Sequence, residues 1–156
     1  MDIVVLAMAF GAGRYSNQPI KLEVEEMVNR KGYDVFTQPD LGELLELKAG
    51  HLFLANQYGN YMSTLALIKQ FVFMAKVHNW GSVRLVAARQ HIWRCACDLR
   101  RLAPEMHIQL YPVTVEYSPD IQPWVRSSIL WWAREIVIRL IPWPLYKKMC
   151  KKRGLS

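Results

Sequence analysis

The segment Arg89-Gln90-His91-Ile92-Trp93-Arg94 brings two guanidinium groups and an imidazole within six residues of one another. It follows an apolar run, 83–88, that predicts a buried strand, and it opens the next predicted helix. A phosphate or carboxylate suits such a site, because arginine presents a planar fork of donors and a helix N-terminus adds backbone amides. We therefore predict that Arg89, His91 and Arg94 bind an anion. The alternative is structural: His91 caps the helix and both arginines are solvated.

His91 is also the candidate for acid or base catalysis, because the ordinary pKa of histidine, about 6.5, lies close to physiological pH. The chain contains no Gly-Lys-Ser/Thr phosphate loop, no nucleophile elbow and no His-Glu-x-x-His motif. Cys95 and Cys97 lie two positions apart in a predicted helix, where side chains point about 200° apart, so they do not chelate one metal. The sequence therefore names neither a reaction nor a cofactor, and it predicts no metal site.

Two further polar loci follow predicted strands. Asn17 and Gln18 come after the apolar run 2–10, and Asn60 and Thr64 lie at the start of a long helical segment. Because the carboxyl ends of parallel strands meet at one edge of a sheet, we expect both loci to complete the ligand pocket around His91. Each locus has an alternative interpretation as a helix cap.

Strands alternate with helices along the chain. Apolar or β-branched runs predict strands, and apolar positions at helical spacing predict helices. The predicted strands are 2–10, 33–37, 51–55, 83–88 and 108–115, and the predicted helices are 19–30, 41–47, 61–78, 91–102 and 124–141. This alternation predicts an α/β fold, a Rossmann-like three-layer sandwich with a mostly parallel central sheet.

The predicted helix 124–141 has one apolar half. Its charged residues, Arg134, Glu135 and Arg139, fall on the other half of the helical wheel. The apolar half comprises Val125, Ile129, Leu130, Trp132, Ala133, Ile136, Val137, Leu140 and Ile141. This pattern predicts that the apolar half packs on the sheet, and three mid-helix charges argue against a membrane span.

The 156 residues are 52% hydrophobic and carry a net charge of +7, which excludes a disordered chain and fits one globular domain. Residues 1–60 hold five basic and eight acidic side chains, 61–119 hold seven and three, and 120–156 hold eight and two. We predict a single α/β domain over 1–141 and a basic C-terminal tail over 142–156. Within this tail, Lys147 to Arg153 form a candidate peripheral contact with a membrane. Nucleic acid is not favoured, because no aromatic residues interleave a basic stripe.

The three cysteines match neither a disulfide framework nor a zinc site. We expect no signal peptide, because Met1-Asp2 runs into the first predicted strand without a basic n-region or a small-residue cleavage site. We therefore expect a cytoplasmic protein, with membrane association through the basic tail as the alternative.

The order of these features resembles the bacterial YdcF/SanA/ElyC-like family, long catalogued as a domain of unknown function. The matching motifs are Ser16-Asn17-Gln18-Pro19, Asn60 to Thr64, Arg89-x-His91-x-x-Arg94 and Arg134-Glu135, and the resemblance covers most of residues 2–140. It implies a Rossmann-like domain whose polar motifs gather at the carboxyl edge of the sheet. It also implies a small-ligand or nucleotide-type pocket and a link to bacterial envelope biogenesis.

Two departures from the family favour a second hypothesis. The family usually carries Glu where this chain has Gln18, and its first glycine-bearing strand has no counterpart here. The second hypothesis is a non-catalytic interaction module that acts through its basic, Trp-rich C-terminal end on a membrane surface or a protein partner. A sheet edge left uncovered by the absent strand would suit a second copy of the chain, which gives a homodimer.

Overall fold

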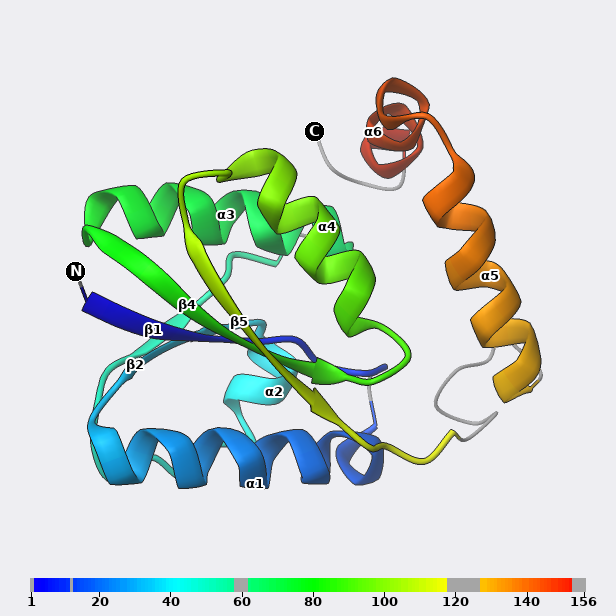
Figure 1. The fold of residues 1–156 in the computed structure, drawn as a ribbon. Helices are drawn as coiled ribbons and strands as arrows, with labels where there is room; N and C mark the ends of the chain where they lie inside the picture. Colours follow the sequence, from blue (N-terminus) through cyan, green and yellow to red (C-terminus); the bar gives the residue numbers. More distant parts are fainter. Residues whose placement is uncertain (1, 12, 58–61, 118–126, 153–156) are drawn as a thin grey trace.

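A five-stranded parallel sheet with the strand order β3-β2-β1-β4-β5 forms the centre of the computed structural model (Figure 1). The structure describes residues 2–11, 13–57, 62–117 and 127–152. The strands are β1 (Asp2–Ala7), β2 (Asp34–Thr37), β3 (Leu52–Leu54), β4 (Trp80–Ala88) and β5 (His107–Val113). Each strand overlaps a predicted one, because apolar and β-branched runs suit a sheet that is covered on both faces.

Helices lie on both faces of this sheet and beyond its carboxyl edge (Figure 1). They are α1 (Arg14–Lys31), α2 (Pro39–Gly42), α3 (Thr64–Val77), α4 (Ile92–Leu102), α5 (Ser128–Leu140) and α6 (Trp143–Lys152). Helices α1 and α2 cover one face, and α3 and α4 cover the other. The predicted α/β fold, a Rossmann-like three-layer sandwich, is therefore confirmed.

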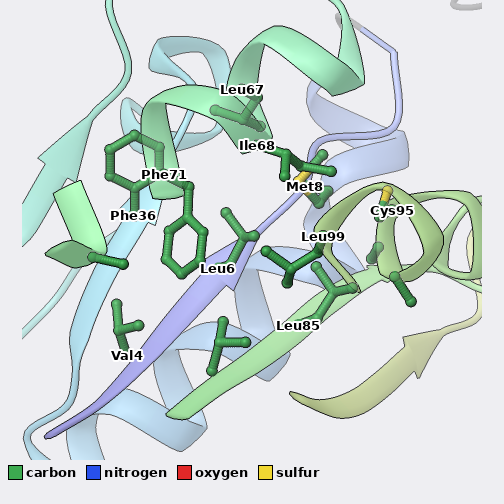
Figure 2. Packing of buried hydrophobic residues seen from close by; sticks show 14 of the residues in the cluster. Val4, Leu6, Met8, Phe36, Leu67, Ile68, Phe71, Leu85, Cys95 and Leu99 are labelled. Atoms are coloured by element: carbon green, nitrogen blue, oxygen red, sulfur yellow. The ribbon is translucent and has the colours of Figure 1, made fainter. Parts of the chain in front are cut away.

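The central strand β1 contributes side chains to two separate hydrophobic cores. Val4 and Leu6 pack with α3 and α4, whereas Val5 and Ala7 pack with α1. All four side chains are fully buried. Figure 2 shows the first core, where Leu6 lies beside Phe71 of α3. Burial of a valine or leucine side chain of this kind stabilises a fold by about 1.5–3 kcal/mol, so β1 anchors the whole sandwich.

Three helical segments differ from the predicted ranges. Helix α2 covers only Pro39–Gly42, whereas the sequence predicts a helix over 41–47. Helix α1 begins at Arg14 and includes Pro19, which was expected to start it. The earlier start follows from Asn17, whose side chain folds the β1–α1 connection onto the first helical turn. The segment interpreted as a basic tail, 142–156, contains a helix over Trp143–Lys152, and Tyr146 is buried against α4. The C-terminal segment is thus docked on the sandwich through α6.

The side of helix α5 that faces the protein is opposite to the side predicted from the sequence. Its inward residues are Trp131 and Glu135, one helical turn apart, and both are buried. The expectation that the apolar half packs on the sheet is wrong, because Ile129, Ile136 and Leu140 in that half are exposed. The physical reason is that a buried ion pair and one aromatic contact, rather than apolar area, determine the orientation of this helix. Across the described ranges, no helix has the length and apolar character needed to cross a membrane.

Candidate functional site

Four polar side chains from three helices meet where the strands end. Thr64 is the first residue of α3, His91 occupies the N-cap position of α4, Arg94 lies in the first turn of α4, and Glu135 comes from α5. Arg94 Nη2 donates to Thr64 Oγ1 at 3.1 Å and to His91 Nδ1 at 3.0 Å. Arg94 Nη1 lies 2.9 Å from Glu135 Oε1. We call these four residues the Arg94 cluster.

The contacts of His91 define its protonation state. Nδ1 faces Arg94 and accepts from the guanidinium, so the ring proton is on Nε2, which donates to Thr64 Oγ1 at 3.2 Å. Burial and the neighbouring positive charge of Arg94 lower the pKa of His91 below its ordinary value. The imidazole is therefore neutral at physiological pH, and both of its nitrogens are used within the protein.

Glu135 is the negatively charged partner of the buried Arg94 guanidinium. Its side chain is 0% exposed, which by itself raises the pKa of the carboxyl group, but the surrounding groups reverse that effect and lower the pKa. At 3.9 Å, His91 Nδ1 is beyond hydrogen-bond distance from Oε1, so we attribute the lowering mainly to Arg94 and Arg134. Glu135 therefore stays ionised and balances one of the two guanidinium charges.

A second buried acid, Asp98, lies four residues after Arg94 on α4. Asp98 Oδ2 accepts from the Tyr146 hydroxyl at 2.9 Å, which ties α6 to α4. Burial raises the pKa of Asp98 to about 6, although the Tyr146 hydrogen bond and Arg94 act in the opposite direction. This carboxyl group therefore changes its charge near the lower end of the physiological pH range.

A small pocket of about 60 Å³ opens beside the Arg94 cluster, between the start of α3 and helices α5 and α6. Its lining residues are Ser63, Thr64, Arg94, Arg134, Ile138, Tyr146, Met149 and Cys150. Among the described residues, the lining includes two guanidinium groups and no acid. Arg134 is partly exposed, and its guanidinium carbon lies 4.9 Å from the centre of the Trp131 ring. The pocket can therefore receive a small anionic group at the carboxyl edge of the sheet.

The structure brings together three of the predicted site residues, Thr64, His91 and Arg94. Arg89 is exposed in the turn before α4, where its backbone N–H donates to the Val113 carbonyl at 2.8 Å. It does not join the Arg94 cluster. Asn60 lies outside the described residues.

In the connection between β1 and α1, the side chain of Asn17 hydrogen-bonds to backbone groups. Asn17 Oδ1 accepts from the Phe10 N–H at 2.7 Å, and Nδ2 donates to the Gly11 and Gly13 carbonyls. The side chain is 1% exposed, so its hydrogen bonds hold the connection rather than face a pocket. Gln18 points to solvent.

The helical wheel placed Glu135 on the solvent half, and the ligand site predicted from the sequence did not include it, although the family resemblance counts Arg134-Glu135 among the motifs expected at the carboxyl edge of the sheet. Arg134, Ser63 and Tyr146 were also absent from the predicted pocket. One signal was available for Glu135: it is the only acidic residue between 121 and 156, against eight basic ones. A single acid in such a segment suggests a specific positive partner elsewhere in the chain.

Two other features do not form a comparable site. A hollow of about 400 Å³ between β3 and α3 has Asn56 and Gln70 in its lining, but these two residues hydrogen-bond to each other. Within the described ranges, no group of three His, Cys, Asp or Glu side chains could hold a metal ion. Cys95 is buried and Cys97 is exposed, so the two thiols face different surroundings.

No protein-family model matches the chain, and no curated protein is significantly similar to it. The geometry of the Arg94 cluster therefore carries the functional argument.

Proposed function

We propose that this protein binds an anionic small molecule, such as a phosphate-bearing compound, in the pocket beside the Arg94 cluster. The observation that carries the proposal is the lining of this pocket by Arg94, Arg134 and Thr64 without an acidic side chain. Glu135 lies 2.9 Å from Arg94 and 4.0 Å from Arg134, so one carboxylate faces two guanidinium groups and leaves a net positive charge for a ligand to pair with.

Two further features of the pocket support anion binding. The N-terminus of α3 begins at Thr64, so backbone amides and the positive end of the helix dipole lie next to the pocket. Thr64 Oγ1 accepts from Arg94 and from His91, and its own proton is then available for a ligand oxygen. The pocket is large enough for one small anionic group rather than for a whole nucleotide.

His91 is a positioning residue in this proposal. Its neutral ring lies between Arg94 and Thr64 and directs both side chains toward the pocket. Acid or base catalysis by His91 stays a prediction from the sequence, since it requires a ring nitrogen that leaves one of these two contacts. The link to bacterial envelope biogenesis rests on the family resemblance alone and is likewise a prediction.

The test is a thermal-shift titration with inorganic phosphate, sugar phosphates and nucleoside monophosphates. A ligand at about 100 times its Kd stabilises the folded state by about 2.7 kcal/mol, which raises the Tm by several degrees. We expect Arg134→Gln to abolish that shift, because it removes the guanidinium at the rim.

Arg139→Gln is the matched control, since Arg139 lies on the same helix but is exposed and outside the pocket lining. The control should keep the full thermal shift. Equal loss in both variants would mean that the anion responds only to general positive charge, and the absence of any shift would contradict the proposal directly.

A further inference from the structure

Helix α5 presents a continuous apolar surface to solvent. Six large side chains on this helix are between 40% and 78% exposed, and together we call them the α5 outer face: Ile129, Leu130, Trp132, Ile136, Val137 and Leu140. Single exposed apolar residues are ordinary, but a contiguous patch of this kind marks an interaction site. In Figure 1, α5 stands beside the sandwich, and the buried side chains of Trp131 and Glu135 mark the side of the helix that faces the protein.

The inward side of α5 prevents the helix from turning this face toward the core. Glu135 is fully buried against Arg94, and Trp131 packs edge-to-face on Phe10 with ring centroids 4.9 Å apart. A rotation that buried Ile136 or Leu140 would expose Trp131 and separate Glu135 from its guanidinium partner. The exposed apolar surface is therefore a fixed feature of the folded chain.

Helix α6, which follows α5 directly, also exposes apolar and basic side chains. Leu145 and Met149 of α6 are exposed, and so are Arg139 of α5 and Lys147 and Lys148 of α6. Between residues 121 and 156 the sequence has eight basic residues and one acid, Glu135, which is buried. An apolar strip with basic neighbours and no exposed acid among the described residues of α5 and α6 is electrostatically complementary to an anionic surface.

We propose that the α5 outer face and the exposed side of α6 dock on an anionic lipid membrane. The apolar side chains enter the boundary between headgroups and acyl chains, and the arginine and lysine side chains pair with lipid phosphates. Trp132 lies at the level of the headgroups, where its amphipathic ring is favoured. This contact is peripheral, and the α5 outer face shares no residue with the lining of the anion pocket.

A second copy of the chain fits the same surface less well. Two α5 outer faces packed together would bring the positive charges of Arg139, Lys147 and Lys148 from both copies to one interface, where the described residues of α5 and α6 offer no exposed acid. Like charges at an interface oppose association, whereas anionic lipid attracts them. The charge pattern therefore selects the membrane over a homodimer as the occupant.

The experiment is flotation of the full chain with phosphatidylcholine vesicles, either neutral or containing one third phosphatidylglycerol. We expect binding to the anionic vesicles, a blue shift of tryptophan emission, and weaker binding at high salt. Ile136→Ser/Leu140→Ser removes two exposed side chains from the outer face and should lower the partition coefficient roughly tenfold or more. Lys147→Gln/Lys148→Gln should lower it by roughly fivefold per charge.

Leu22→Ser/Phe73→Ser is the matched control, because both residues are also more than half exposed but lie on α1 and α3. It should bind anionic vesicles like the unmodified chain. Equal binding by Ile136→Ser/Leu140→Ser, or equal binding to neutral vesicles, would overturn the proposal. So would a dimer in light scattering that Ile136→Ser/Leu140→Ser converts to a monomer, because the surface would then belong to a second copy. Arg134→Gln should leave vesicle binding nearly unchanged while it abolishes anion binding, which separates this proposal from the proposed function.

Discussion

At the scale of single residues, two buried groups near Arg94 titrate with opposite effects on stability. Asp98 has its pKa raised to about 6, so the folded state holds its proton more tightly than the unfolded chain does. Stability from Asp98 is therefore present at low pH and is lost as the pH rises toward 6. His91 has a lowered pKa, so its contribution is lost as the pH falls below about 6.5. The pH dependence of the whole protein mixes the two effects, and single variants are needed to separate them.

Asp98→Asn isolates the effect of the buried acid. The amide oxygen of the variant can still accept from the Tyr146 hydroxyl, but the group no longer ionises. We expect the stability of the unmodified chain relative to Asp98→Asn to fall by about 2–3 kcal/mol between pH 4 and pH 7. Urea unfolding at a series of pH values measures this difference. Parallel pH curves for the two proteins would show that Asp98 titrates as an ordinary surface acid.

At the scale of elements, the connection between β1 and α1 depends on one side chain. Asn17→Ala would leave the buried Phe10 N–H without the acceptor that it has at 2.7 Å. We expect a loss of about 1–3 kcal/mol in the free energy of unfolding. Gln18→Ala, one residue further, removes an exposed side chain and should change stability by less than about 0.5 kcal/mol.

The same pair tests the earlier prediction that this locus binds ligand. If Gln18 contacts the anion, Gln18→Ala weakens binding while stability stays unchanged. If the connection is structural, Asn17→Ala lowers stability and Gln18→Ala affects neither property. Calorimetric titration with inorganic phosphate beside urea unfolding distinguishes the two outcomes.

The helices and strands were largely predictable from the sequence, because burial alone accounts for their apolar patterns. From Val4 to Ala7, β1 is apolar on both faces because both faces are buried. A continuous apolar run in the sequence therefore predicts such a strand. The orientation of α5 was not predictable in this way. A helical wheel assumes that apolar residues face the core, whereas Glu135 is buried by a partner, Arg94, that lies 41 positions earlier in the chain. Periodicity within one helix contains no information about such a partner.

The candidate site was predicted in part for a related reason. His91 and Arg94 share one helix start, so their proximity follows from local spacing. Thr64 joins them because parallel strands place the starts of α3 and α4 at one edge of the sheet. Arg89 shares that sequence neighbourhood but points to solvent, because the turn before α4 directs it outward. The spacing of these residues predicted that they lie at the carboxyl edge of the sheet. The direction in which each side chain points could be determined only from the structure.

At the scale of the whole molecule, the protein is a sandwich with an additional helical layer attached at its carboxyl edge (Figure 1). Helix α5 contacts the sandwich through few groups, chiefly Glu135 with Arg94 and Trp131 with Phe10. These contacts also hold α5 in place as one wall of the anion pocket, and they keep the α5 outer face exposed to solvent. Both proposals therefore depend on these two contacts of α5.

Glu135→Gln tests how strongly this ion pair holds the layer. It leaves the Arg94 guanidinium buried without a charged partner on α5, and we expect the free energy of unfolding to fall by about 3 kcal/mol in urea. Glu26→Gln is the control, because its ion pair with Arg30 has a similar distance, 3.2 Å, but both side chains are exposed, and it should cost less than about 1 kcal/mol. Arg94→Met/Glu135→Leu should be less destabilised than Glu135→Gln, since it leaves no buried charge unpaired. If Glu135→Gln is instead as stable as Glu26→Gln, the ion pair does not hold α5, and apolar contacts such as Trp131 with Phe10 must attach the layer.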